Sequence, residues 1–218
     1  LIGTDGIFVS ESHYFLSLVK TLQYDTIYHE HLRYYTVRSL KNIFKKYGMK
    51  IIKVKKINTH GGSIRVYATK NKKYSVDKTV NKALIEEKKF LSKKNIKIFC
   101  NKVFESKVNL LNMLRKIRSK NNNIYGVGAP SRATTLVNYV GITEEIIDCI
   151  CEIKGSHKIN HYLPGTRIPI VSEEKIFKKK PKYLLLLSWH ISKELIRNLK
   201  KKGYKGKFII PLPSPKVI

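Results

Sequence analysis

A short apolar run that ends in a glycine turn constrains the second half of this chain more than any other feature. Residues 124–128 (IYGVG) are predicted to form a strand that runs into the turn, and a helix is predicted from Ser131 to Tyr139. The alternation continues to the end of the chain, with strands predicted at 146–150, 183–187 and 208–211 and a helix at 192–202. Such alternation is typical of a parallel, doubly wound α/β sheet. We therefore expect one such domain over residues 121–218.

The first 75 residues show a different order of elements. A strand over 6–11 and a helix within 13–23 are followed by a second helix, which Thr36 is placed to cap and Gly48 to end. Two predicted strands, 49–57 and 63–69, flank a glycine pair that supports a tight reversal. This order matches the last part of an α/β sheet, finished by an antiparallel pair, without the first part. Because the chain also begins at Leu1 rather than Met, we expect a fragment of a longer protein.

Residues 76–120 contain neither proline nor glycine and are predicted to be helical. One apolar stripe at helical spacing is predicted to be buried, namely Val103, Val108, Leu111, Leu114 and Ile117. The lysine-rich run 93–102 is predicted to divide the segment into two helices. We expect residues 76–120 to link the domain in residues 1–75 to the domain in residues 121–218.

The formal net charge of +29 requires an explanation. One explanation is an anionic partner such as nucleic acid, an acidic membrane or a phosphorylated small molecule. The other is a compositional enrichment in lysine, and this second explanation is favoured because the lysines are scattered over every segment. They do not form one basic block with interleaved aromatic residues, so we do not expect nucleic acid to be the partner. The sequence does not indicate an oligomeric state.

The three cysteines and the apolar runs indicate the cellular compartment in which the chain is expected. Cys100, Cys149 and Cys151 form no CxxC pair and no disulfide framework, which fits a reducing, cytoplasmic setting. Cys149 and Cys151 are expected to be small core residues of a strand. The longest apolar run is strand-sized, and the N-terminus does not resemble a signal peptide, so no membrane association is expected.

The segment Tyr28-His29-Glu30-His31 is the strongest candidate for chemistry. In an extended backbone, His29 and His31 share one face while Tyr28 and Glu30 share the other. The two histidines supply two metal ligands and no third is suggested by spacing, so no metal is predicted. Structural histidines in a crowded loop remain an alternative. General acid–base chemistry is favoured because a histidine titrates near neutrality and a neighbouring carboxylate or phenol can orient it.

Two glycine motifs are candidates for ligand contacts. His60, Gly61 and Gly62 form either an ordinary hairpin turn or a close approach of the backbone to a ligand. The motif Gly128-Ala129-Pro130-Ser131-Arg132 leads into a helix whose free N–H groups favour a phosphate, and the arginine adds a bidentate donor. A full dinucleotide-binding fingerprint would have glycine where Ser131 stands, so an anion or nucleotide-phosphate site is predicted instead. The loop 164–170 (PGTRIPI) is either a ligand contact or a plain loop.

Seven segments, taken in order, resemble one known family. They are GIFVSESHY, YDTIYHEHLRYYT, THGGSIRVY, YGVGAPSRATTLVNYVGI, YLPGTRIPI, LLLLSWH and GKFIIPLP, and they extend from Gly6 to Pro213. The chain resembles the C-terminal two-thirds of the S-adenosylmethionine-dependent sugar C-methyltransferases that act on nucleotide-diphosphate sugars, such as the 3-C-methyltransferases of deoxysugar biosynthesis. The implied fold is the last part of a class I methyltransferase sheet in residues 1–75, a helical linker, and a second, Rossmann-like domain in residues 121–218.

The resemblance also implies a mechanism and site residues. A base removes the proton next to the ketone of a 4-keto nucleotide sugar, and the enolate attacks the methyl group of S-adenosylmethionine. His31 is similar to the family's base, with Tyr28 and Glu30 in support. The nucleotide-diphosphate sugar would contact two sets of residues: His60, Gly61 and Gly62, and Gly128, Ala129, Pro130, Ser131 and Arg132.

Two parts of the family pattern have no counterpart in this sequence. One is the glycine-rich loop for S-adenosylmethionine. The other is the N-terminal domain with four cysteines, to which we expect zinc to be confined. A fragment of this kind is expected to be inactive by itself. The alternative function is a binding module that holds a nucleotide or nucleotide sugar without chemistry, and a basic nucleic-acid-binding protein is a weaker alternative.

Overall fold

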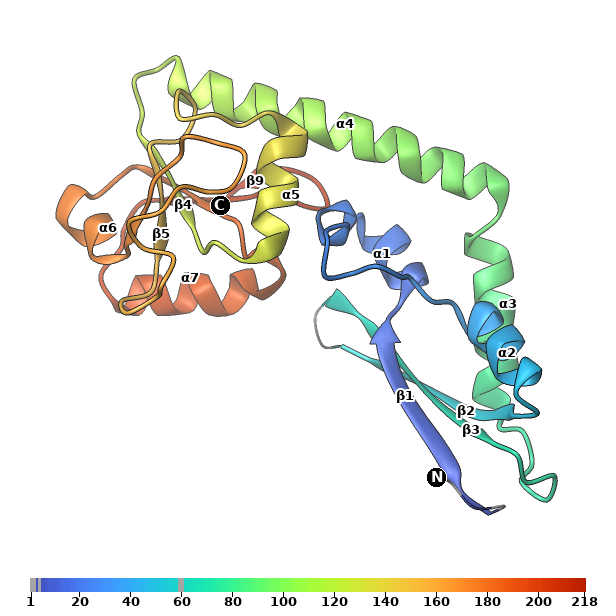
Figure 1. The fold of residues 1–218 in the computed structure, drawn as a ribbon. Helices are drawn as coiled ribbons and strands as arrows, with labels where there is room; N and C mark the ends of the chain where they lie inside the picture. Colours follow the sequence, from blue (N-terminus) through green and yellow to red (C-terminus); the bar gives the residue numbers. More distant parts are fainter. Residues whose placement is uncertain (1–2, 4, 59–60) are drawn as a thin grey trace. The chain divides into compact units, whose positions relative to one another are not determined.

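The chain folds into two compact units. The structure is a computed structural model that describes residue 3 and residues 5–58 and 61–218 (Figure 1). Unit 1 combines residues 1–23 with 31–100, and unit 2 combines residues 24–30 with 101–218. The chain therefore leaves unit 1 after Gln23 and returns to it at His31, within the segment that carries the candidate chemistry.

Unit 1 is built on a three-stranded antiparallel sheet. Its strands β1 (Ile7–His13), β2 (Lys50–Ile57) and β3 (Ser63–Thr69) are ordered β1-β3-β2, and Ile57 of β2 pairs with Ser63 of β3. The helices are α1 (Phe15–Thr21), α2 (Val37–Lys46), α3 (Lys78–Phe90) and the first part of α4 (Lys93–Arg118). The predicted first strand and the antiparallel pair are confirmed.

Helix α2 begins where its sequence predicts. The Thr36 side chain accepts a hydrogen bond from the Ser39 N–H at 3.0 Å, and the Thr36 N–H donates to the Ser39 hydroxyl at 2.9 Å. This reciprocal cap satisfies two backbone donors at the start of the helix. Val37, Leu40 and Phe44 are buried, whereas Ile43 is 38% exposed.

A buried carboxylate from α3 supports the same helix start. Glu87 is 3% exposed and accepts hydrogen bonds from the N–H groups of Val37 at 2.5 Å and Arg38 at 3.0 Å. It also accepts one from the Tyr14 hydroxyl at 2.9 Å. Burial, together with the nearby negative charge of Glu87, raises the pKa of Tyr14, so its phenol remains a donor. Glu87 thereby joins β1, α2 and α3 through one side chain.

The helical segment is divided at a different place from the one predicted. Helix α3 ends at Phe90 and α4 begins at Lys93, so the run 93–102 lies inside α4 instead of interrupting it. The backbone carbonyl and the hydroxyl of Ser92 accept from the N–H groups of Ile96 and Asn95, which starts the new helix there. The buried residues of α4 are Ser106, Leu110, Leu114 and Ile117, so only two residues of the predicted stripe are correct.

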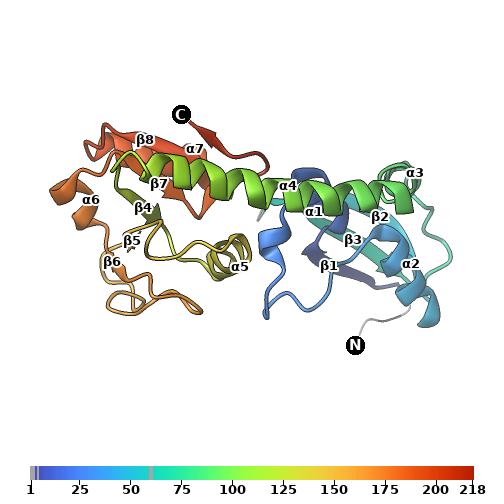
Figure 2. The ribbon, with the colours of Figure 1, turned by 90° about the horizontal axis from the view of Figure 1, so that it is seen from above.

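Unit 2 contains a mainly parallel sheet. Its strands are β4 (Ile124–Val127), β5 (Cys149–Glu152), β6 (Ile170–Ser172), β7 (Tyr183–Leu186), β8 (Lys207–Ile210) and β9 (Lys216–Val217). Their order is β6-β5-β4-β7-β8-β9, and only β9 is antiparallel to its neighbour. Helices α5 (Ser131–Val140), α6 (Glu174–Lys179) and α7 (Ser192–Lys201) connect strands, and Figure 2 shows α5 and α6 beside the sheet. The predicted α/β class with a parallel sheet flanked by helices is confirmed.

Three details of unit 2 differ from the sequence prediction. Strand β5 begins at Cys149 rather than Ile146, and β6 and α6 replace part of the predicted loop. Asp148 immediately before β5 accepts from Arg118 of α4 at 3.1 Å and from the Ile124 N–H at 3.0 Å. The N–H groups of Ile146 and Ile147 donate to the Thr143 carbonyl at 3.0 Å, so these two residues belong to a turn before the strand. The domain boundaries given by the sequence remain predictions.

The role of Glu87 can be measured by the stability of a variant. We expect Glu87→Gln to lower the free energy of unfolding by about 2 kcal/mol, because an amide offers one acceptor oxygen where the carboxylate serves three donors. Urea denaturation measures this loss. The matched control is Glu86→Gln, whose ion pairs with Lys20 and Lys56 are partly exposed and should contribute less than about 1 kcal/mol. Equal losses in the two variants would contradict this role of Glu87.

Candidate functional site

The order of the parallel strands places a crevice at the carboxyl end of β4. Strand β4 lies between β5 and β7, and the chain leaves it toward β5 on one side and returns through β7 on the other. Ligands of doubly wound sheets bind at such a switch point. Gly128 follows β4 with a φ of +81°, and a Cβ atom there would lie 2.6 Å from the Ser188 hydroxyl beyond β7. Glycine is therefore required where these two strand ends meet.

The peptide of Ala129 is held on both sides before α5 begins. Its N–H donates to the Glu152 carboxylate at 2.8 Å, and its carbonyl accepts from the Lys158 ammonium at 2.8 Å. Glu152 ends β5, and Lys158 lies in the connection from β5 to β6. The anion site predicted at this turn therefore has one donor fewer, because the Ala129 N–H already donates to the Glu152 carboxylate.

Arg132 belongs to a buried network rather than to an open anion site. Its Nε and Nη2 atoms each donate to the Asp25 carboxylate at 2.8 Å, and the Trp189 indole N–H donates to the same carboxylate at 2.7 Å. The Asp25 side chain is fully buried and that of Arg132 is 8% exposed. The guanidinium also lies 5.0 Å from the Trp189 ring centroid. This network fixes residues 24–30 to α5 and to the turn after β7.

Tyr24 strengthens the same attachment. Its ring is buried and lies edge-on to that of Tyr139 of α5, with 5.2 Å between the ring centroids. Burial raises the pKa of Tyr24 to about 12, against an opposing influence of the nearby Ser106 hydroxyl. The segment that carries Tyr28, His29 and Glu30 is thus held to unit 2 by buried aromatic and ionic contacts.

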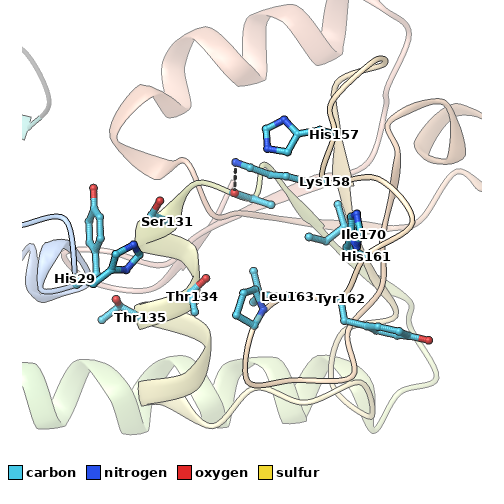
Figure 3. A pocket seen from close by; sticks show the side chains of 13 residues that line it. His29, Ser131, Thr134, Thr135, His157, Lys158, His161, Tyr162, Leu163 and Ile170 are labelled. Carbon is cyan, nitrogen blue, oxygen red and sulfur yellow. Dashed lines mark hydrogen bonds between the residues drawn. The ribbon is translucent and has the colours of Figure 1, made fainter.

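A pocket of about 400 Å³ opens beside α5 (Figure 3). We call it the α5 pocket. Three sources contribute its side chains: the segment 24–30, the start of α5, and the connection from β5 to β6. The polar members are Tyr28, His29, Ser131, Thr134, Thr135, His157, Lys158, His161 and Tyr162, and the apolar ones are Ala129, Leu163, Pro164 and Ile170. Figure 3 shows His29 on one side of the pocket and His157, Lys158 and His161 across it.

Tyr28 and His31 of the predicted catalytic group are half-buried, whereas Glu30 is exposed. Burial is the largest cause that raises the pKa of Tyr28, the negative charge of Glu30 raises this pKa further, and the Arg132 guanidinium opposes both. The phenol is therefore kept protonated, as a hydrogen-bond donor. Residues 28–30 form a bend and a turn, so the extended backbone considered from the sequence is not present.

His31 lies in unit 1, against a histidine that the sequence did not single out. The ring of His13, at the end of β1, is edge-on to that of His31 with 5.5 Å between centroids, and is 6.3 Å from that of Tyr34. Both ring nitrogens of His13 are buried. The Phe15 N–H donates to the Tyr35 carbonyl at 3.0 Å, which ties the chain after His31 to the end of β1. This long-range pairing gave no signal in the sequence.

The glycine hairpin of unit 1 packs against the protein itself. Gly61 has a φ of +87°, and a Cβ atom there would lie 2.0 Å from the Gln23 side chain, which donates to the Gly61 carbonyl at 2.6 Å. A Cβ atom at Gly62 would lie 2.6 Å from Ser17. These contacts account for both glycines without a ligand, and their predicted ligand contact remains a prediction. His60 lies outside the described residues.

Several pocket residues were missed by sequence reasoning. They are His157, Lys158 and His161, which come from the loop before PGTRIPI. Their position in a loop that follows the carboxyl end of a parallel strand was the available signal. Asn138 of α5 donates to the Pro164 carbonyl at 2.9 Å, which fixes this loop against the helix. The predicted ligand roles of Gly128, Ala129, Pro130, Ser131 and Arg132 remain predictions.

The described residues contain neither a cluster of metal ligands nor a membrane-spanning helix. Across residues 5–58 and 61–218, no three His, Cys, Asp or Glu side chains come together in a way that could hold a metal ion. Within the same residues, no helix combines the length and the apolar character needed to span a membrane.

Comparison with known proteins identifies a family. Residues 58–213 match the family model described as the C-methyltransferase C-terminal domain. The chain is also 32% identical, over 222 aligned positions, to C-methyltransferase NovU from Streptomyces niveus. That alignment covers 100% of this chain and 53% of NovU, so the chain spans about half the length of this relative. The chain belongs to the C-methyltransferase C-terminal domain family.

Proposed function

We propose that this chain acts within an S-adenosylmethionine-dependent C-methyltransferase whose substrate is a 4-keto nucleotide-diphosphate sugar. The match of residues 58–213 to the C-methyltransferase C-terminal domain carries this proposal. The name of NovU describes the same class of reaction, and the seven ordered segments point to a nucleotide sugar. The proposed substrate explains why a loop with an acid–base motif and a doubly wound unit occur in one chain.

The proposed chemistry begins with a proton on carbon. The ketone acidifies the C–H bond on the adjacent carbon, and the His31 imidazole takes that proton. The electron pair of the C–H bond then forms the enolate, whose negative charge rests on the former ketone oxygen. The protonated phenol of Tyr28 is suited to donate a hydrogen bond to that oxygen. Glu30, an acceptor at neutral pH, is suited to orient a sugar hydroxyl or an imidazole N–H.

The α5 pocket is the proposed place for the nucleotide part of the substrate. Lys158 supplies an ammonium at the pocket wall, and the hydroxyls of Ser131 and Thr134 supply neutral donors. Glu152 stands at the carboxyl end of β5, where nucleotide-binding sheets of this order carry an acid that binds ribose hydroxyls. A carboxylate at the turn and an ammonium beside it favour a ligand that offers both hydroxyls and phosphates.

The methyl group would come from S-adenosylmethionine, which supplies an electrophilic methyl carbon. Sheets of this class hold such nucleosides with a glycine loop after a parallel strand. Among the described residues of unit 1, β1, β2 and β3 pair only in the antiparallel sense, and no such loop follows them. We therefore propose that the roles of these residues end at the enolate.

His13 is proposed as a positioning residue for the base. Its ring contacts that of His31, and it is fixed by the pairing of β1 with β3, in which His13 lies opposite Ser63. Glu11 and Arg65, on the same face of the sheet, are hydrogen-bonded to each other at 2.7 Å. A second imidazole in this place can hold the His31 ring in the orientation that proton transfer requires.

Solvent exchange tests the base without a methyl donor. We expect the chain to accelerate deuterium uptake from D2O at the carbon next to the ketone of a thymidine-diphosphate 4-keto sugar, followed by NMR. His31→Ala should slow this exchange about 100-fold or more, because general-base catalysis contributes at least that factor. The control is Leu32→Ala, which truncates the adjacent side chain, 82% exposed and outside the α5 pocket, and should change the rate less than about threefold.

Binding measured alongside exchange distinguishes the proposed enzyme from the alternative, a binding module. Calorimetric titration with the nucleotide sugar should give the same affinity for His31→Ala as for the unchanged chain. Tight binding without any accelerated exchange in the unchanged chain would support the binding module instead. Unchanged exchange in His31→Ala would exclude His31 as the base.

A second prediction concerns the pocket. Lys158→Met should weaken the binding of thymidine diphosphate roughly tenfold, because it removes the ammonium that both faces the pocket and holds the Ala129 carbonyl. Lys154→Met is the matched control from the same loop, because its side chain is 82% exposed and bound to Glu174. Titration calorimetry at one ionic strength measures both. Similar losses in the two variants would show that the pocket is not the diphosphate site.

A third prediction tests His13. His13→Phe keeps an aromatic ring beside His31 and should lower the rate constant for exchange about tenfold, with KM for the sugar unchanged. His13→Gln restores a polar partner and should recover most of that loss. A purely structural role would instead alter stability and KM together and show no recovery with glutamine.

A further inference from the structure

Two lysine-rich runs that are separate in the sequence come together in unit 2. Each has five lysines in eight residues, in 175–182 and in 200–207, whereas lysine and arginine together make up 44 of the 218 residues of the whole chain. The first run includes the end of α6 and leads into β7, and the second includes the end of α7 and leads into β8. Because β7 and β8 are parallel neighbours, both runs reach the same end of the sheet.

Specific hydrogen bonds hold the two runs side by side. The Lys207 N–H donates to the Lys182 carbonyl at 2.8 Å, and Tyr183 lies opposite Lys207 in the register of the two strands. The buried Tyr204 hydroxyl donates to the Pro181 carbonyl at 3.0 Å, and it lies 3.3 Å from the Lys207 carbonyl oxygen. The sequence interpretation that the lysines form no common block therefore does not hold at this end of the sheet.

Between the runs lies a hollow of about 500 Å³, which we call the lysine hollow. Lys180, Lys182, Lys202 and Lys205 contribute to its wall, together with Tyr204. Gly206 also lines it, and a Cβ atom there would lie 2.2 Å from the Tyr204 hydroxyl, so glycine is needed for this close packing. The hollow lies before the amino ends of β7 and β8, at the opposite end of the strands from Gly128 and the α5 pocket.

Acidic side chains neutralise little of this charge. Of the ten lysines in the two runs, Lys202 alone forms an ion pair with a described residue, Glu173, at 2.6 Å. The neighbouring Glu174 pairs with Lys154, which lies outside both runs. Repulsion among ammonium groups held this closely opposes folding, and an anion bound between them would relieve it.

We propose that the lysine hollow is a binding site for a small molecule that carries two or more linked phosphate groups. Ammonium groups on flexible stems pair with phosphate oxygens as point charges, and four lysines line one concavity. A hollow of this size accommodates an oligophosphate or a nucleoside polyphosphate. This site is separate from the proposed catalytic function.

Titration of the full chain with sodium tripolyphosphate tests the proposal. The variant K180Q/K182Q/K202Q/K205Q should raise Kd at least about tenfold, because it removes every ammonium that borders the hollow. The matched control K102Q/K116Q/K120Q/K193Q removes the same number of charges from exposed positions elsewhere in unit 2 and should change Kd less than about threefold. Circular dichroism melting of both variants verifies folding.

A variant that preserves charge tests whether the hollow has a built shape. Tyr204→Phe removes the hydroxyl contacts that hold the two runs together and should raise Kd roughly threefold with no change in net charge.

Three outcomes would overturn the proposal. They are an absence of tripolyphosphate binding, an equal effect of the two quadruple variants on Kd, and tighter binding of a short DNA duplex that both quadruple variants weaken equally. The second and third would show that anion binding does not depend on the lysine hollow. None of them depends on whether His31 is the base.

Discussion

The buried carboxylate of Asp25 is the interaction on which the candidate site depends. It is fully buried and accepts three hydrogen bonds, two from Arg132 and one from Trp189, residues that lie 107 and 164 positions further along the chain. A buried ion pair is stable only when its hydrogen bonds are complete, and removing one partner typically costs 3–5 kcal/mol. The network therefore holds residues 24–30 in unit 2, although the chain on both sides of them belongs to unit 1. The position of Tyr28 and His29 in the α5 pocket follows from this attachment.

Local signals in the sequence were sufficient for the elements whose stabilising contacts are also local. Thr36 caps α2 through Ser39, three residues away, and the glycine turn after β4 is followed by a helix as its sequence indicates. Prediction failed at two boundaries. Before β5, Ile146 and Ile147 donate to the Thr143 carbonyl in a turn, and Asp148 is bound to the distant residues Arg118 and Ile124. The long helix is interrupted at Ser92, whose hydroxyl accepts from the Asn95 N–H, although a serine could equally have continued the helix.

The candidate site shows the same division between local and long-range information. An arginine in the first turn of a helix after a glycine turn is a reasonable phosphate donor, but its two-pronged geometry suits a carboxylate equally well, and Asp25 is bound there. His13 and His31 were not connected from sequence because the contact depends on how β1 and the returning chain meet. By contrast, the ligand crevice at the end of β4 could be expected from strand order alone, which topology fixes before any side chain is considered.

The distribution of charge in unit 2 argues that the α5 pocket and the lysine hollow differ in kind. At the α5 pocket, the Ala129 peptide is held between a carboxylate and an ammonium, so opposite charges are balanced within one turn. Four lysines line the lysine hollow, and of these Lys202 alone forms an ion pair with a described residue, Glu173. A balanced site selects ligands by the geometry of their hydroxyls and phosphates, whereas an unbalanced site selects them by charge. The two proposed sites lie at opposite ends of the same parallel strands, so they would distinguish anions by geometry at one end and by charge at the other.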